Sequence, residues 1–210
     1  MTDHAIEASA WQALDLPGAE LALLPHWLEA AEADALFAAL RADVAWETHR
    51  IRLFGREVAV PRLSCWIGDA GSGYVYSHHR FEPRPWPPVL AALRARVEDV
   101  CGARFNSVLA NLYRDGADSM GWHSDDEPEL GAQPVIASLS LGAERCFRLR
   151  RKLPRGTTLA AGDTLELWLA HGSVLRMAGD TQRLYRHDLP KVRAPVGARI
   201  NLTFRWTGPA

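Results

Sequence analysis

Hydrophobic and polar side chains alternate strictly along residues 199–207, RINLTFRWT. A period of two places all the polar residues on one face of a β-strand and all the apolar residues on the other. The polar face carries two arginines, Arg199 and Arg205, which bracket Asn201 and Thr203. Inside a barrel such a face requires an anion between the arginines, because buried guanidinium groups are costly unless they are paired. A dicarboxylic acid fits this spacing, and a solvated outer face is the alternative.

Two segments, residues 29–44 and 87–102, have the periodicity of amphipathic helices. Prolines at the start of the second segment and Gly102 at its end suit a helix start and a C-cap. Residues 103–207 hold β-rich runs separated by Gly, Pro or Asp turns, without the βαβ rhythm of a Rossmann fold. The pattern predicts an α+β, mainly β fold, in which two helices support a jelly roll or barrel. We expect little regular structure in residues 1–24.

The composition is that of an ordinary globular protein, with 48% hydrophobic and 23% charged residues among 210. No apolar run reaches the length that spans a membrane, and the N-terminus lacks the features of a secretory signal. The three cysteines form no CxxC motif and are expected to be reduced. These observations indicate a cytoplasmic protein, or a nuclear one in a eukaryote, with no membrane partner.

The formal net charge of -1 conceals an uneven distribution of charged residues. Residues 1–47 hold nine acidic residues and one basic residue, which leaves 23 basic and 16 acidic residues in the remainder. This excess of positive charge in residues 48–210 favours a polyanion as a partner. An exposed acidic helix together with scattered basic residues explains the same numbers equally well.

The stretch MGWHSDDEP, residues 120–128, contains a candidate metal site. In an extended segment His123 and Asp125 project to the same side, because they are two positions apart. An imidazole and a carboxylate are two of the three ligands of the 2-His-1-carboxylate site that suits non-haem Fe(II). His171 and His187 are the downstream candidates for the third ligand. We favour His187, in a strand-like run, because His171 precedes Gly-Ser and predicts a turn. An acidic surface turn remains the alternative, since HxD alone is common by chance.

Two further polar side chains share one face of the run LANLYRDG, namely Asn111 and Tyr113. An amide and a phenol are suitable hydrogen-bond donors to a small acid, although an ordinary strand gives the same pattern. Competing motifs are absent from the sequence: there is no HExxH, zinc-deaminase signature, Walker A loop or GxGxxG.

Taken together, NLYRDG, HSDDE, the distant His187 and RINLTFR resemble, in order and spacing, the AlkB family of Fe(II)/2-oxoglutarate-dependent dioxygenases. The segments RLFGREVAVPR and GYVYS resemble the nucleotide-recognition lid of the duplex-DNA-acting AlkB homologues. The resemblance implies a single catalytic domain over residues 1–210. Within it, residues 1–24 would be a leader, residues 25–102 the helices and lid, and residues 103–207 a double-stranded β-helix, or jelly roll, core.

The resemblance also implies which residues form the cofactor site. The implied ligands of Fe(II) are His123, Asp125 and His187. The implied contacts of the distal carboxylate of 2-oxoglutarate are Asn111, Tyr113 and Arg199. The implied contacts nearer the metal are Asn201, Thr203 and Arg205. The dicarboxylate would supply the anion that two inward arginines require, and O2 would be the co-substrate.

A finger-like residue is implied for the lid. Phe54, in RLFGR, sits where duplex-acting homologues place an intercalating side chain that fills the vacated base stack. Arg52 and Arg56 flank it and would contact phosphates. The alternative is a β-hairpin whose phenylalanine packs into the core.

Three more residues are implied to face a base flipped out of the helix. Tyr76 matches the aromatic residue that stacks on the base, with Tyr74 as the neighbouring alternative, and Asp126 and Glu127 follow the metal ligands. A carboxylate there favours a cationic lesion. The basic run RLRRKLPR, residues 148–155, and the loop at residues 191–193 are either phosphate contacts or solvated loops.

The resemblance implies oxidative demethylation of N-alkylated bases in DNA, such as 1-methyladenine and 3-methylcytosine, with release of formaldehyde. The expected partner is DNA, as duplex or single strand, and we expect a monomer. The alternatives are a 2-oxoglutarate hydroxylase or demethylase acting on RNA or protein, and a non-catalytic nucleic-acid-binding jelly roll. No protein nucleophile is needed, because the cofactors carry the oxidation.

Overall fold

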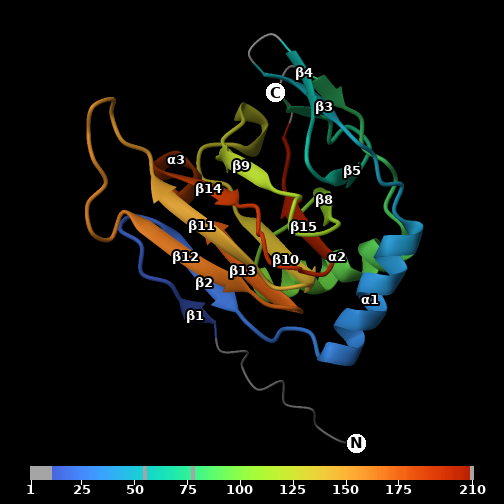
Figure 1. Cartoon of the computed structure of the whole chain (residues 1–210). Helices are drawn as coiled ribbons and strands as arrows, with labels where there is room; N and C mark the ends of the chain where they lie inside the picture. Colours follow the sequence, from blue (N-terminus) through green and yellow to red (C-terminus); the bar gives the residue numbers. More distant parts are fainter. Residues whose placement is uncertain (1–10, 54–55, 77–78, 209–210) are drawn as a thin grey trace, which may run out of the picture.

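The computed structural model describes residues 11–53, 56–76 and 79–208, and its core is a sandwich of two antiparallel sheets (Figure 1). The larger sheet has the strand order β1-β2-β13-β10-β15-β8-β5. Its strands are β1 (Gln12–Ala13), β2 (Glu20–Leu24), β13 (Ser173–Ala178), β10 (Ile136–Gly142), β15 (Arg199–Arg205), β8 (Ser107–Tyr113) and β5 (Leu63–Gly68). The mainly β jelly roll predicted from the sequence is confirmed.

The smaller sheet has the order β12-β11-β14-β9. Its strands are β12 (Thr164–Leu169), β11 (Arg145–Arg151), β14 (Tyr185–Leu189) and β9 (Met120–His123). Apolar side chains from both sheets form one core cluster between them, for example Ile136 and Leu175 with Leu149 and Leu167. Two short helices, α3 (Thr181–Leu184) and η1 (Pro128–Leu130), interrupt the β-rich half of the chain.

The two predicted helices are confirmed, as α1 (Ala30–Asp43) and α2 (Pro88–Cys101). In α2 the buried positions Leu90, Leu93, Val97 and Cys101 recur at spacings of three and four, which forms a single apolar stripe. Gly102 ends the helix in the left-handed conformation. The buried apolar residues of α1 and α2 pack together in a second core cluster. This cluster also contains Ile200, Leu202 and Phe204, the apolar face of β15.

The polar face of β15 points into the sandwich, so all seven residues of this strand are buried. Ile200, Leu202 and Phe204 are fully excluded from solvent on the helix side. Arg199 and Arg205 are 2% and 3% exposed on the other side. The strict alternation in the sequence therefore gives β15 an apolar face that packs against the helices and a polar face that lines the space between the sheets.

The prediction of little regular structure in residues 1–24 is wrong for part of that segment. β2 pairs along its whole length with β13, and β1 extends the same sheet edge. In ELALL the buried residues are Leu21 and Leu24, three positions apart, so no alternation reveals the strand. Its pairing depends on contacts with residues 150 or more positions away, which local periodicity does not report.

Two hairpins extend beyond the sandwich. They are formed by β3 (Arg50–Leu53) with β4 (Arg56–Ala59), and by β6 (Tyr74–Tyr76) with β7 (His79–Phe81). The first hairpin lies above β8 and β15 in Figure 1. No helix in the described ranges combines the length and apolar character needed to cross a bilayer.

Gly142, at the end of β10, provides a test of the packing between the sheet and α1. Its φ is +84°, and a Cβ there would collide with the Ala198 carbonyl and lie 2.8 Å from the Phe37 ring. We expect Gly142→Ala to lower the free energy of unfolding by about 2–5 kcal/mol, from the left-handed backbone and overpacking together. Denaturant unfolding measures this change.

The matched control is Gly156→Ala, where φ is +88° and a Cβ would meet nothing within 4 Å. This variant bears the backbone strain alone, about 1–2 kcal/mol. Equal destabilisation of the two variants would show that the contact between Gly142 and α1 does not constrain the fold.

Candidate metal centre and its pocket

Three predicted ligands converge between the sheets. His123 ends β9 and is paired in register with His187 of β14, so their rings lie 4.2 Å apart between centroids. Asp125 follows two residues later, with Oδ1 3.7 Å from Nε2 of His123. One ligand atom from each residue lies within 4.8 Å of the other two. The alternative candidate, His171, lies in the turn before β13, where its Nδ1 accepts a hydrogen bond from the Gly142 N–H at 2.7 Å.

Hydrogen bonds orient these side chains. Nδ1 of His123 lies 2.8 Å from the Gly121 carbonyl. In the neutral ring Nδ1 therefore carries the proton, which leaves the lone pair of Nε2 on the side of Asp125. The backbone N–H of Asp125 donates to Oε1 of Gln182 at 2.9 Å, and Arg205 donates to Oδ2 of Asp125 at 2.7 Å. These hydrogen bonds hold the metal-binding atoms in position.

The protonation states also suit metal binding. Burial raises the pKa of Asp125, but Arg205 and the two histidines outweigh it and bring the pKa to about 2. Burial, with His123 adding to it, lowers the pKa of His187 to about 3. Burial also lowers the pKa of His123. At neutral pH the cluster is two neutral imidazoles and one carboxylate, the forms that bind metal.

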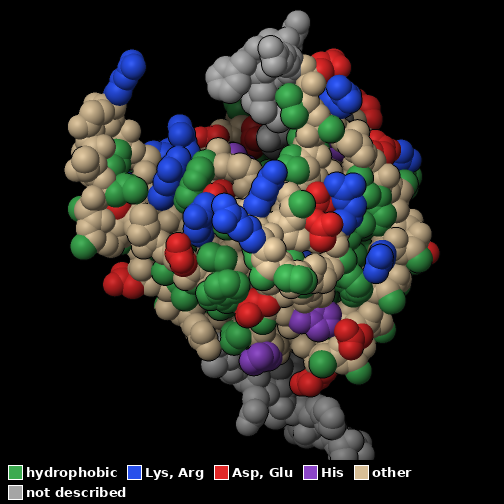
Figure 2. Space-filling model, in the orientation of Figure 1, with side chains coloured by type: hydrophobic (Ala, Val, Ile, Leu, Met, Phe, Trp, Pro, Cys, Tyr) green, Lys and Arg blue, Asp and Glu red, His purple; other side chains and the backbone are tan. Residues whose placement is uncertain are grey.

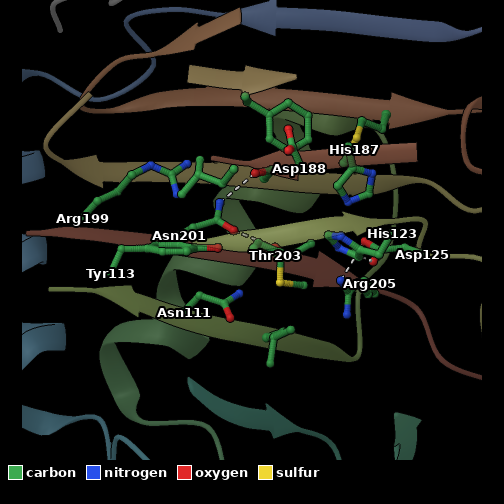
Figure 3. Close-up of a pocket in the computed structure, with 16 residues that line it drawn as sticks. Asn111, Tyr113, His123, Asp125, His187, Asp188, Arg199, Asn201, Thr203 and Arg205 are labelled. Atoms are coloured by element: carbon green, nitrogen blue, oxygen red, sulfur yellow. Dashed lines mark hydrogen bonds and ion pairs between the residues drawn. The ribbon is translucent and has the colours of Figure 1, made fainter. Parts of the chain in front are cut away.

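A pocket extends from this cluster along β15 (Figure 3). Arg199 and Tyr113 lie at the far end, while Asn111, Asn201 and Thr203 lie between them and the cluster. The structure brings together in one lining all nine residues predicted for metal and dicarboxylate, which are Asn111, Tyr113, His123, Asp125, His187, Arg199, Asn201, Thr203 and Arg205.

The far end of the pocket holds a buried cation with spare hydrogen-bonding capacity. Nη2 of Arg199 donates to Oγ of Ser140 at 2.8 Å, and the guanidinium lies 5.5 Å from the centre of the Tyr113 ring. Nε of Arg199 has no hydrogen-bond partner among the described residues. Burial lowers the pKa of Arg199 to about 10, so it remains charged at neutral pH. Such a group stabilises a carboxylate placed beside it.

Four residues that position this site were missed at the level of sequence: Arg62, Ser138, Ser140 and Gln182. Nε of Arg62 donates to Oδ1 of Asn111 at 2.8 Å, and Ser138 accepts a hydrogen bond from Asn201 at 2.8 Å. The serines alternate in IASLSLG, so a period of two could have identified them as the polar face of β10. Arg62 and Gln182 contact residues 49 and 57 positions away, and no local pattern marks them.

The residues predicted to contact the substrate lie in different parts of the structure, and one of them is not described. Phe54 lies outside the described residues. Arg52, Arg56 and Tyr76 belong to β3, β4 and β6. Asp126 is exposed, and its carboxylate accepts a hydrogen bond from Nζ of Lys152 at 2.7 Å.

Basic side chains gather over β11 and β14 on one face of the molecule (Figure 2). The guanidinium groups of Arg148 and Arg150 lie 5.2 and 4.1 Å from the centre of the Trp122 ring. The basic run predicted from the sequence thus starts on the outer face of the smaller sheet and continues into the loop after β11.

Comparison with known proteins decides the family. Residues 20–205 match the model of the 2OG-Fe(II) oxygenase superfamily. The chain is 42% identical, over 89% of its length, to the rat protein named alpha-ketoglutarate-dependent dioxygenase alkB homolog 3. It is also 42% identical, over 83% of its length and 75% of the relative, to mouse DNA oxidative demethylase ALKBH2. The chain belongs to the AlkB family of this superfamily.

The chain spans only part of some relatives, 64% of the length of the rat protein. A solved structure titled the structure of OsALKBH1 supports the fold of this AlkB-family chain. It matches with a TM-score of 0.62 and 17% identity, and the match covers 93% of this chain and 99% of that one.

The residues of the chain fit the cofactors that its family name specifies, Fe(II) and 2-oxoglutarate. Two imidazoles and one carboxylate form the donor set that suits Fe(II). At the opposite end of the pocket, the buried Arg199 has an unused Nε–H among the described residues. It can pair with the second carboxylate of a dicarboxylic acid.

We expect metal binding to displace fewer protons than two ordinary histidines would release, because the pKa of His187 is about 3 and the pKa of His123 is lowered from its ordinary value. A lowered pKa keeps each histidine in the neutral form that binds metal. Calorimetric titration of Mn(II) at about pH 6, in buffers of different ionisation enthalpy, should give less than about 0.8 proton per metal, since His187 contributes almost none and His123 contributes less than a histidine of ordinary pKa. Two histidines of ordinary pKa would release about 1.5 protons, and a value near that would contradict the buried, neutral pair.

Proposed function

We propose that this chain is an Fe(II)/2-oxoglutarate-dependent dioxygenase that demethylates N-alkylated bases in DNA, such as 1-methyladenine and 3-methylcytosine. The observation that carries the proposal is one pocket with a His-Asp-His cluster at one end and Arg199 at the other. Arg199 is buried and has no carboxylate partner among the described residues. The name DNA oxidative demethylase, borne by relatives 42% identical to the chain, supports DNA as the substrate.

In the proposed site His123, Asp125 and His187 bind Fe(II). Asn111, Tyr113 and Arg199 hold the distal carboxylate of 2-oxoglutarate, and Asn201, Thr203 and Arg205 line the pocket nearer the metal. When bound, the cofactors and O2 oxidise the N-methyl carbon as 2-oxoglutarate is converted to succinate and CO2, and the methyl group leaves as formaldehyde.

The residues of the chain act by placing charge and excluding water. Arg205 donates to the carboxylate of Asp125, which keeps this carboxylate ionised and oriented. Gln182, in α3, accepts a hydrogen bond from the backbone N–H of the same residue. The burial of Asp125 and His187, 2% and 5% exposed, excludes bulk water from these two proposed metal ligands.

The proposed substrate is DNA whose damaged base is flipped into the pocket. Phe54 fills the vacated stack, Arg52 and Arg56 hold phosphates, and Tyr76 stacks on the base. Glu127 favours a cationic base by its charge. Asp126, paired with Lys152, contacts the substrate beside the metal ligands. We propose that the chain acts on duplex DNA, as a monomer.

The reaction is tested with Fe(II), 2-oxoglutarate and an oligonucleotide that contains 3-methylcytosine. We expect formaldehyde and the repaired base in equal amounts. His187→Ala and Asp125→Ala should reduce turnover by more than about 100-fold, because each removes a metal ligand. DNA binding, measured by fluorescence anisotropy, should persist in both variants.

His26→Ala is the matched control, since this histidine is exposed and lies outside the pocket. Its activity should equal that of the unmodified chain. Absence of formaldehyde and of repaired base from the unmodified chain would refute DNA demethylation. Succinate release without repair would leave an oxygenase with a different substrate.

The duplex preference is tested with Phe54→Ala. Loss of the finger should reduce repair of a duplex about tenfold while changing repair of a single strand by less than about twofold, since only the duplex leaves a vacated stack. Val58→Ala, on the exposed part of β4, is the control for a general loss of hairpin structure. Equal effects on duplex and single strand would argue against an intercalating role.

A further inference from the structure

A second buried arginine lies behind the far end of the pocket. Arg145 is the first residue of β11 and is 1% exposed. Its guanidinium lies 6.0 Å from the centre of the Tyr113 ring, and the guanidinium of Arg199 lies 5.5 Å from the same ring. Arg145 is not among the residues that line the pocket. One tyrosine ring is therefore shared by two buried cations, of which one faces the ligand space.

The contacts of Arg145 tie together two chain segments around this end of the pocket. Nη1 donates to the carbonyl of Asp115 at 3.1 Å, and Nη2 donates to the carbonyls of Asp118 at 3.0 Å and Pro190 at 2.6 Å. The first two carbonyls belong to the loop between β8, which carries Tyr113, and β9, which carries His123. The third begins the loop that leads to Arg199 on β15.

No carboxylate in the described part of the chain forms a direct ion pair with Arg145. All its hydrogen-bond partners are backbone carbonyls, and its Nε has no partner among the described residues. The nearby carboxylate of Asp118 accepts two hydrogen bonds at 2.8 Å from the guanidinium of Arg114. The carboxylate of Asp115 accepts the backbone N–H of Ala117.

The balance of charge at this end is therefore positive. Arg114, Arg145 and Arg199 stand against the carboxylates of Asp115 and Asp118, which leaves a surplus of one positive charge. Burial lowers the pKa of Arg199, and the proximity of Arg145 lowers it further, as expected for two cations held close together. A carboxylate beside Arg199 would relieve this repulsion as well as pair with Arg199.

We infer that Arg145 is a positioning residue for the distal carboxylate of 2-oxoglutarate. It fixes the loops that hold Tyr113 and Arg199, and it adds positive potential from behind the ring. The inference rests on the proposed cofactor assignment and concerns only one end of the ligand. Arg145 should therefore affect ligands that reach Arg199 and leave unchanged ligands that reach only the metal.

Two probes separate these ends. N-oxalylglycine has a metal-chelating group and a distal carboxylate, whereas oxalate has the chelating group alone. Calorimetric titration of each into the Mn(II)-loaded full chain compares Arg145→Met, which removes the charge, with Arg145→Lys, which keeps the charge but replaces the planar two-nitrogen fork that holds the three carbonyls. Arg104→Lys is the matched control, since that side chain is 80% exposed and pairs with Glu98.

For N-oxalylglycine we expect the Kd to rise about 10–100-fold in Arg145→Met and about 3–10-fold in Arg145→Lys. For oxalate we expect changes within about twofold in both variants. In turnover assays the KM for 2-oxoglutarate should rise by similar factors, with kcat at saturating 2-oxoglutarate nearly unchanged. Arg104→Lys should match the unmodified chain in every measurement.

Equal losses for N-oxalylglycine and oxalate would overturn the inference, because they would show general damage to the fold. Unchanged affinity for both ligands would overturn it as well. If Arg145→Met fails to fold, Arg145→Lys decides between the same outcomes. An unmodified chain that binds oxalate and N-oxalylglycine equally would refute the assignment of the distal carboxylate to Arg199, whatever its activity on DNA.

Discussion

The burial of positive charge on the inner face of β15 is the constraint on which the rest of the site depends. A guanidinium group transferred from water to the interior loses much of its hydration, and only an opposite charge or good hydrogen bonds recover the loss. Arg205 recovers it within the protein, through Asp125. Arg199 recovers it only in part, through Ser140 and the ring of Tyr113. Two arginines that look equivalent in the sequence therefore have different tasks.

The same strand is fixed in register by its opposite face. Ile200, Leu202 and Phe204 are fully buried against the helices. A slip of one residue would exchange the two faces, placing arginines among apolar side chains and apolar side chains in the pocket. Hydrophobic packing on one side thus sets the position of the polar groups on the other. The apolar packing therefore keeps Arg199 and its neighbours in position, although not every polar group in the pocket has a hydrogen-bond partner among the described residues.

The sequence was sufficient where a local pattern carries the information. Alternation in residues 199–207 predicted the two faces of β15, and the spacing of His123 and Asp125 predicted that they share a side. The choice of His187 over His171 agrees with their positions in a strand and a turn. Where partners are distant in the chain, local patterns failed, as for β2, Arg62 and Gln182. The assignments of Phe54, Tyr76 and Glu127 to DNA contacts stay predictions.

The two halves of the pocket come from different layers of the sandwich. His123 and His187 lie on the smaller sheet, whereas Arg199 and Asn111 lie on the larger one. A metal and a dicarboxylate bound together would therefore act as a cross-link between the layers, in addition to the apolar contacts of the core. Ligand at about 100 times its Kd would add about 2.7 kcal/mol to the stability of the folded state. Amide hydrogens of both sheets would then exchange more slowly together, so that cofactor supply would also set the lifetime of the folded protein.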